Sequence, residues 1–312
     1  MTIDKILTIL QIIAPIFTSV FLGVLARKRK ILTQEGVASL QQFVIKFCLP
    51  CVLFNSCLTA TFAAESLGAM SLVLVALLCG CLWAFRWGRK RFPYHNLPQL
   101  FAAQETGMLG IPLFITLFGA AEAYRVGILD LAQAFVAIPT ITVLASSGTG
   151  KPSLGGILKN IFTSPLMLMS LLGLILNVSG VHSLLEGIGV APVITDTTEF
   201  LAQPVSAVML FSVGYNFSLG KSNRKRIFAI SALHFVSFGL VAAVVFQLVI
   251  GLLGQVDALT RWALLLYCLL PSSFLAPSLG KNQEDAIVAS GVCSLLTAVT
   301  LVGFCVISVL VA

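Results

Sequence analysis

The strongest constraint on this chain is a series of ten long apolar segments separated by short polar stretches. Most are near 20 residues, the length of helix that crosses the hydrocarbon core of a bilayer. The segments are residues 6–26, 38–58, 66–85, 97–118, 123–145, 161–179, 194–215, 227–250, 261–279 and 286–311. Only 10% of the residues are charged, whereas soluble domains carry roughly 25%. The sequence therefore predicts an all-α integral membrane protein with ten transmembrane helices.

The basic residues predict how these helices are oriented. Most of the 19 Lys and Arg residues lie in alternate loops, with clusters at 27–30, 86–91, 151–159 and 221–226. By the positive-inside rule these loops are cytoplasmic, which places both termini outside a plasma (inner) membrane. The net charge of +7 then reflects topology, and no nucleic-acid partner is predicted. The first apolar run is too long for a cleavable signal peptide and is interpreted as the first helix.

The fourth apolar segment is interrupted at its centre by polar residues, glycines and a proline. They are Gln104, Glu105, Thr106, Gly107, Gly110 and Pro112. Proline lacks an N–H and clashes with the preceding turn, so a straight helix cannot pass through it. Freed backbone at membrane depth is tolerated only where it is buried in protein or lines a cavity. The ninth segment has a matching interruption at Pro271, Ser272, Ser273 and Phe274.

Matched prolines indicate an internal repeat. The pairs are Pro15 with Pro165, Pro50 with Pro204, and Pro112 with Pro271, at offsets of 150, 154 and 159 residues. Each unit holds five helices, an odd number, so the second unit enters the membrane from the opposite side. The expected organisation is a repeat in residues 1–145, a glycine-rich cytoplasmic linker in 146–160 and an inverted repeat in 161–312. Inverted repeats with broken helices are typical of secondary transporters, whose substrates bind at the breaks.

The two interruptions predict an anion site. If the helices resume near Pro112 and Pro271, their N–H groups and positive dipole ends meet near the midplane from opposite sides. Hydroxyl groups of Thr106, Ser272 and Ser273 would add donors. In the alternative interpretation the prolines only kink two helices and the hydroxyls bond backbone. The sequence predicts that the two breaks lie within a few ångströms of each other.

Four further side chains are candidates for coupling or binding. Glu105 is ionisable within a span, so it either binds a proton that travels with the substrate or stays solvated by a cytoplasmic cavity. Lys46 either snorkels to the cytoplasmic face, pairs with Glu105 or meets an anionic substrate. Asp130 and Gln133 fall in the fifth segment, which should pack against the break. Asp130 is either a second proton or cation site or an acceptor for freed N–H groups.

Several stretches carry a family resemblance. They are residues 22–27, 32–36, 47–54, 106–113, 270–273 and 284–286, which read LGVLAR, LTQEG, FCLPCVLF, TGMLGIPL, LPSS and EDA. With these motifs the chain resembles the auxin efflux carrier family of secondary transporters over nearly its whole length. Relatives usually have asparagine at position 105 and an aromatic residue at position 46, so Glu105 and Lys46 are departures.

The resemblance implies a ten-helix fold like that of bile-acid and sodium/proton transporters, with helices 4 and 9 crossing. Helices 1, 2, 6 and 7 would form a scaffold, and helices 3–5 and 8–10 a mobile core. It also implies a homodimer and small organic anions as substrates.

The predicted function is secondary transport of a small organic anion (a carboxylate) by elevator-like alternating access. Proton coupling is one version of this prediction. The alternatives are a transporter-like membrane sensor, and an uncoupled anion carrier or channel. No enzyme is predicted, because the three histidines lie far apart and outside any catalytic motif. No metal or cofactor site is predicted either, since the eight cysteines all lie in apolar runs.

Overall fold

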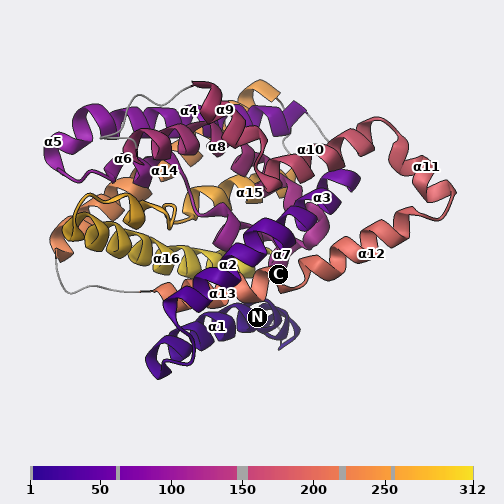
Figure 1. Cartoon of the computed structure of the whole chain (residues 1–312), viewed down its shortest axis with the longest axis horizontal. Coiled ribbons are helices and arrows are strands. Elements are labelled where there is room, and N and C mark those ends of the chain that lie inside the picture. The colour runs from indigo at the N-terminus through magenta and orange to yellow at the C-terminus, as the bar shows by residue number, and fades with distance from the viewer. Residues whose placement is uncertain (1–2, 61–63, 146–153, 218–222, 254–256, 312) are drawn as a thin grey trace.

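The computed structural model describes residues 3–60, 64–145, 154–217, 223–253 and 257–311, and their regular elements are all helical (Figure 1). Within these residues, four helices are long and apolar enough to cross a membrane: Ile9–Arg29, Gln34–Thr59, Ala120–Leu144 and Gln283–Val311. Shorter apolar helices span Thr106–Phe118, Pro165–Val178 and Ala258–Leu269. The prediction of an all-helical fold is confirmed for the described residues, and four helices suit a membrane, whereas the count of ten spans and the inverted repeat stay predictions.

In the first half of the chain, three of the predicted spans contain or end in a wide π-helical turn, namely at Val44–Cys48, Ala84–Gly88 and Thr106–Gly110. The elements are α1 (Ile3–Arg29), α2 (Gln34–Phe43), η1 (Val44–Cys48), α3 (Leu49–Thr59), α4 (Ala64–Trp83), η2 (Ala84–Gly88) and α5 (Arg89–Arg91). The broken fourth segment consists of α6 (Leu97–Ala102), the π-turn η3 (Thr106–Gly110) and α7 (Ile111–Phe118). It is followed by η4 (Ala120–Ala123) and α8 (Tyr124–Ala145).

The second half begins with a helix earlier than predicted. Helix α9 (Leu154–Phe162) occupies part of the predicted linker, while residues 146–153 lie outside the described residues. The following elements are α10 (Pro165–Val178), α11 (Val181–Gly187), α12 (Ala191–Ala202), α13 (Pro204–Asn216) and α14 (Arg224–Leu253). The chain ends with α15 (Ala258–Leu269), the 3-10 turn η5 (Ala276–Leu279) and α16 (Gln283–Val311).

Glycines bring two pairs of helices into backbone contact. Helix α1 packs along α13, and α3 packs along α10. A Cβ on Gly23 would lie 2.0 Å from the Phe211 carbonyl oxygen, and one on Gly173 would lie 2.5 Å from the Phe54 carbonyl oxygen. Small residues are the usual means of close helix packing in membranes. Each pair joins the first helix of one half to the second helix of the other, as two symmetric repeats would.

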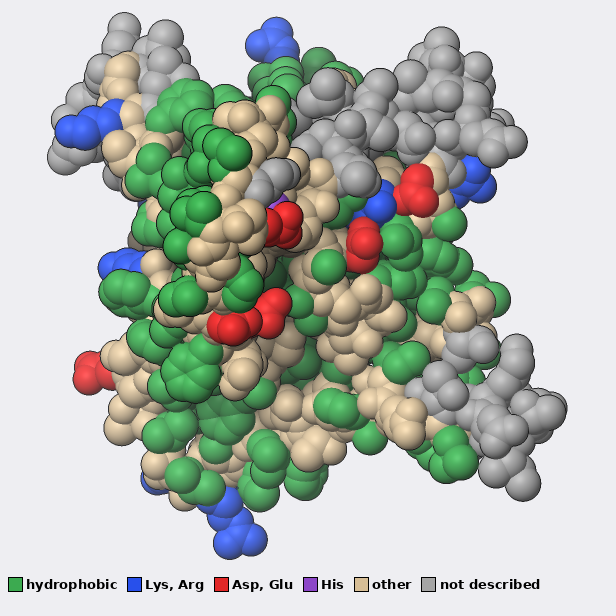
Figure 2. Space-filling view, turned by 90° about the vertical axis from the view of Figure 1, so that its right-hand side faces the viewer, with side chains coloured by type: hydrophobic (Ala, Val, Ile, Leu, Met, Phe, Trp, Pro, Cys, Tyr) green, Lys and Arg blue, Asp and Glu red, His purple; other side chains and the backbone are tan. Residues whose placement is uncertain are grey.

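A broad apolar surface surrounds α11 and α12. These helices extend from the body at the right of Figure 1, and Figure 2 views the molecule from that side. Hydrophobic side chains cover much of that face, with a few acidic side chains near its middle. Val178, Ile188 and Phe200 are each at least 70% exposed. An apolar surface of this kind suits contact with lipid or with another membrane protein.

The polar contacts divide the chain into two sets of elements. We call residues 3–60 and 154–217 the scaffold set, and residues 64–145, 223–253 and 257–311 the core set. In the described part of the chain, the side-chain hydrogen bonds and ion pairs identified lie within one set or within the other. Examples are the bonds of Asn177 to the carbonyls of Cys57 and Ala60 in the scaffold set, and the Arg125–Asp257 ion pair in the core set. Contacts between the sets are mainly apolar, including α13 against α7 and α3 against η4.

Candidate functional site

The two predicted breaks lie directly against each other in the core set. Helix α6 ends at Ala102 and α15 ends at Leu269, and extended backbone follows each. The Glu105 N–H donates to the Pro271 carbonyl at 2.8 Å, and the Ser273 N–H donates to the Ala103 carbonyl at 3.0 Å. These bonds form a short antiparallel bridge. The breaks are therefore as close as predicted, while their role in substrate binding stays a prediction.

A glutamine side chain from α8 replaces the helical hydrogen bonds that the first break loses. Gln133 Oε1 accepts from the Gln104 N–H at 2.9 Å, and Gln133 Nε2 donates to the Gln104 carbonyl at 3.1 Å. The hydroxyl of Tyr267 on α15 donates to Gln133 Oε1 at 2.9 Å. All three residues are buried. The amide thus satisfies both backbone groups of Gln104 in a place that water does not supply.

Asp130 belongs to this polar cluster and does not bond freed backbone. Its Oδ1 accepts from the Thr106 hydroxyl and, at 2.6 Å, from Gln133 Nε2. Gln133 Nε2 also lies 2.8 Å from Thr106 Oγ1. The structure therefore brings together Thr106, Asp130 and Gln133, as their positions in the sequence suggested. In one alternative, Asp130 accepts hydrogen bonds from backbone N–H groups of the break. In the described residues its identified donors are side chains instead.

The expectation that a helix resumes near each proline is confirmed at the first break and wrong at the second. Helix α7 begins at Ile111 with Pro112 in its first turn, although a π-turn precedes it. The first break is already helical from Thr106, and the π-turn η3 places Pro112 one turn further on. Its wide hydrogen bonds, such as Gly110 N–H to the Glu105 carbonyl at 3.1 Å, lead into a proline that lacks an N–H. After Pro271 the chain forms only the four-residue turn η5. The predicted second helix N-terminus is therefore absent from residues 270–279.

Other predicted residues are engaged by protein groups. The Ser272 hydroxyl donates to the Leu100 carbonyl at 2.8 Å, which matches the alternative interpretation in which the hydroxyls bond backbone. The Gln104 side chain, with its nitrogen toward the neighbouring acceptors, lies 3.1 Å from the Pro271 carbonyl and 3.3 Å from His234 Nε2. These contacts hold the bridge in place. They also engage both side chains, so neither is available to bind a ligand.

The far end of the second break is tied to the start of the first broken helix. Asn96 Nδ2 donates to the carbonyl of Ala276 at 2.9 Å and to that of Asp285 at 3.1 Å. The Asp285 carboxylate accepts from the Lys281 N–H at 3.0 Å. The loop from η5 into α16 is thereby anchored, which fixes Ser273 and Phe274 relative to Glu105.

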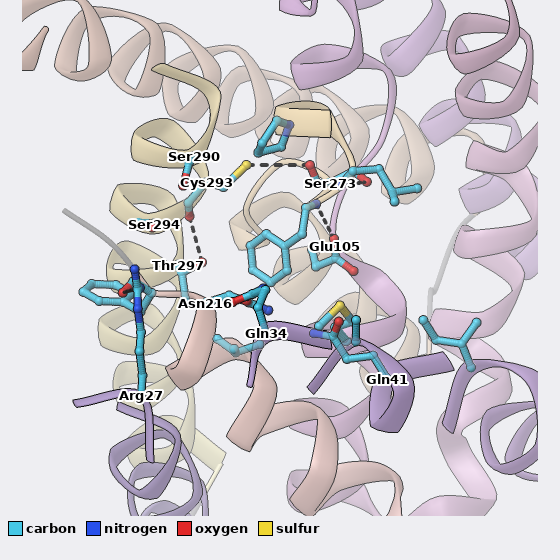
Figure 3. A pocket seen from close by; sticks show the side chains of 18 of the residues that line it. Arg27, Gln34, Gln41, Glu105, Asn216, Ser273, Ser290, Cys293, Ser294 and Thr297 are labelled. Carbon is cyan, nitrogen blue, oxygen red and sulfur yellow. Dashed lines mark hydrogen bonds between the residues drawn. The ribbon is translucent and has the colours of Figure 1, made fainter. Parts of the chain in front are cut away.

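We call the bridged residues 103–105 and 271–273 the crossing. One side of it faces a cavity of about 640 Å³ (Figure 3). Glu105, Ser273 and Phe274 line it from the breaks. The cavity lies between the two sets of elements. The scaffold set contributes residues of α1, α2 and α13, and the core set contributes a polar face of α16. Gly107 and Met108 follow the break, and Met108 also lines the cavity.

Glu105 is the acidic residue of this cavity wall. It is 9% exposed, and its Oε2 accepts from the Phe274 N–H at 2.6 Å. The described residues show no ion pair to it. Lys46, one predicted partner, is exposed on η1 and is not part of the cavity lining. A carboxyl group that is nearly buried without a neighbouring cation favours its neutral form or an incoming positive charge.

Residues 8–153 match the sequence profile of a family described as membrane transport protein. Over these residues the chain resembles the auxin efflux carrier family of membrane transport proteins. The match indicates a membrane transporter. The match runs from α1 to the end of α8 and includes the first break. Comparison with curated proteins gives no match.

Sequence reasoning missed several residues of the cavity. Gln34, Gln41, Asn216 and Arg27 come from the scaffold set, and Gln34 Nε2 donates to Asn216 Oδ1 at 2.9 Å. On α16 the missed residues are Ser290, Cys293, Ser294 and Thr297. Their spacing of three and four residues places them on one face of a helix, which is a readable signal in an otherwise apolar segment. The scaffold residues gave no comparable signal, because they come from three separate helix ends.

Proposed function

We propose that this protein is a secondary carrier that moves a small organic anion, a carboxylate, by elevator-like alternating access. The observation that carries the proposal is the position of the cavity between the two sets of elements. One wall belongs to the scaffold set and the other to the core set. A movement of one set past the other would move the breaks and their ligand relative to the fixed wall.

The contact between the sets favours sliding. Leu53 of α3 packs against α8, where a Cβ on Gly127 would lie 2.6 Å from its Cδ2. Val213 of α13 belongs to the same apolar core as Leu109 and Phe114 of the broken helix. Apolar surfaces shift past each other without the cost of orphaned hydrogen-bonding groups. Within the core set, by contrast, the bridge and the Gln133 cluster hold the two breaks together.

Several donors suit a carboxylate ligand. The cavity wall carries the guanidinium of Arg27 and the amides of Gln34 and Asn216. Arginine offers five N–H donors in a planar fork that matches a carboxylate. The Arg27 Nη1 donates to the Phe217 carbonyl at 2.9 Å, so the head group is held in place at the end of α13.

Glu105 gives this carrier a way to couple to protons. An anionic solute in the cavity would repel the ionised carboxylate, and burial already disfavours the charged form. Proton and anion then bind together, because each removes a penalty on the other. Asp130 is the second candidate, since it lies on the other side of the break and contacts Thr106.

We further propose that the carrier is a homodimer of the plasma (inner) membrane with both termini outside. The alternating basic clusters of the sequence support the orientation. The exposed apolar side chains of α10 to α12 suit contact with lipid or with a second copy. Cross-linking in native membranes and protease protection of tagged termini test these two points.

Flux measurements test the function. Purified protein in proteoliposomes is expected to show saturable, temperature-dependent uptake of at least one mono- or dicarboxylate, accelerated by an inward proton gradient. A thermal-shift screen of carboxylates identifies ligands first, because a ligand that binds only the native state raises the apparent melting temperature. A ligand that binds without flux would instead identify a sensor. Flux that does not saturate would identify a channel.

A further inference from the structure

The cavity wall carries one acidic and one basic side chain, which have opposite formal charges when both are ionised. Among the residues that line it, Glu105 is the acidic one and Arg27 the basic one. The remaining lining residues are amides, hydroxyls, a thiol and apolar side chains. Figure 3 shows Arg27 and Glu105 on opposite sides of the cavity. A wall with no net charge is a poor receptor for a solute that carries only negative charge.

The carboxylate of Glu105 has unused capacity. The carboxylate accepts from the Phe274 N–H and also interacts with the Met108 N–H. Asp130, the nearest acidic residue of the crossing, accepts hydrogen bonds from Thr106 and Gln133 and supplies no positive charge to Glu105. A carboxylate accepts about four hydrogen bonds in all. A cationic group that arrives through the cavity would therefore meet an acceptor that the protein leaves without a cation.

The guanidinium of Arg27 is a fixed counterpart at the other side. Its Nη1 contacts the carbonyls of Tyr215 and Phe217, at 3.4 Å and 2.9 Å. Neither contact is a salt bridge, so the positive charge of Arg27 is not cancelled by these partners. A head group anchored in this way loses less side-chain entropy when a carboxylate binds to it.

We propose that the solute of this carrier is an amphoteric carboxylate, such as an α-amino acid, whose ammonium group binds Glu105 and whose carboxylate faces Arg27. The inference rests on the proposed function and specifies its substrate class. The bound solute neutralises both wall charges at once, and the amides and hydroxyls between them accept a polar side chain. Phe274 and Met108 offer an apolar surface for a hydrophobic one. A plain carboxylate uses the same cavity when a proton occupies Glu105, so the amino acid and the proton are alternative partners of one carboxyl group.

Matched solute pairs test the inference on the purified full-length protein. The pairs are leucine with 4-methylpentanoate, phenylalanine with 3-phenylpropionate, and glutamate with glutarate, whose members differ by the α-ammonium group. Dissociation constants are measured at pH 7.5 by calorimetry. In at least one pair the amino acid is expected to bind about tenfold more tightly, a difference of about 1.4 kcal/mol. Equal or weaker binding of the amino acid in every pair overturns the inference, and so does the absence of amino-acid binding in all three.

Two variants assign the preference to its residues. Glu105→Gln keeps an acceptor for the Phe274 N–H and removes the charge, so the two members of a pair should bind with similar affinity. Arg27→Gln should weaken both members and leave their ratio unchanged. A preference that survives in well-folded Glu105→Gln protein contradicts the role of Glu105. The wild-type comparison decides the substrate class even if a variant does not fold.

Flux of the same solutes separates this inference from the proposed function. Proteoliposomes that transport only the plain acids leave the carrier function intact and refute the amphoteric substrate. Amino-acid binding without flux of any solute has the opposite meaning, because the ligand class then stands and the carrier function fails.

Discussion

The α1–α13 contact and the crossing of the two breaks both bring distant parts of the chain together, but by opposite means. At the first, Gly23 and Gly214 let two regular helices touch through backbone atoms, and a Cβ on Gly214 would lie 1.9 Å from the Val20 carbonyl oxygen. At the second, helical bonds are given up and replaced by bonds between the segments. At these two glycines the first contact leaves no space between the helices. The second contact exposes polar groups to a cavity. The chain therefore joins α1 and α13 by close packing, and it builds the candidate site with hydrogen bonds.

The largest effect on stability is expected from a substitution that removes the support of the crossing. Gln133→Leu leaves the backbone groups of Gln104 and the hydroxyl of Tyr267 without their partner. Each orphaned buried group costs about 1–3 kcal/mol. The variant is therefore expected to lose several kcal/mol of stability, measured as a large fall in apparent melting temperature. The control is Gln42→Leu, the same change at an exposed amide, which should melt like wild type. A Gln133→Leu protein as stable as this control would show that the cluster does not hold the crossing.

The corresponding change at the contact between α1 and α13 is Gly23→Ala. Its new methyl group would meet the Phe211 carbonyl oxygen at 2.0 Å and the Tyr215 nitrogen at 2.7 Å, and backbone atoms cannot rotate away. Overpacking of this kind costs about 1–3 kcal/mol. Gly187→Ala is the matched control, because nothing lies within 4 Å of its Cβ position. The melting temperature of Gly23→Ala should fall below that of Gly187→Ala, and the reverse order would contradict the close packing of α1 on α13.

A third change tests the charge at the crossing. If a proton binds Glu105 together with a plain carboxylate, lowering the pH tightens carboxylate binding by up to about tenfold per pH unit. Glu105→Gln should bind the carboxylate with little change between about pH 5 and 8, because the proton is no longer taken up. The other titratable or charged groups near Glu105 are Asp130, Cys293 and Arg27, with His234 reached through Gln104. A pH profile that persists in Glu105→Gln would exclude Glu105, and Asp130→Asn then tests the second carboxyl group.

The smallest expected effect on stability comes from Pro112→Ala. Alanine restores an N–H, which allows the wide turn η3 to tighten and displaces Thr106 and Glu105 from the crossing. Uptake is expected to fall several-fold while stability changes by about 1 kcal/mol or less. Pro15→Ala in α1 is the control, because that proline lies in a helix that contributes no part of the bridge. Equal uptake by the two variants would show that the proline does not shape the site.

Local composition was sufficient to predict the apolar helices, the two breaks and the contact between them. Proline and glycine act within their own turn of the chain, so their effect is visible in the sequence. The exact point at which a helix resumes is not local. The first break begins before Thr106 because residues 103–105 pair with residues 271–273, which are far away in the sequence. The same reason explains why η5 is short, since Asn96 and Asp285 hold the chain in another direction.

The candidate site was predicted in part for a related reason. Glu105, Ser273 and Phe274 line the cavity, whereas the side chains of Gln104 and Ser272 donate hydrogen bonds to protein acceptors. A sequence shows which side chains are polar but not which of them find a partner in the folded protein. The wall formed by Arg27, Gln34 and Asn216 depends on where three helix ends meet, so only the structure reveals it.

The bridge between the breaks also has a consequence for how the chain is synthesised. The ribosome completes residues 103–105 long before it adds residues 271–273. During that interval the Glu105 N–H and the Ala103 carbonyl have no strand to pair with, and a bilayer interior offers no water to replace it. The newly made first half must therefore keep this stretch hydrated or shielded by the insertion machinery. Arrival of the second half then completes the bridge, which makes the crossing one of the last parts of the protein to form.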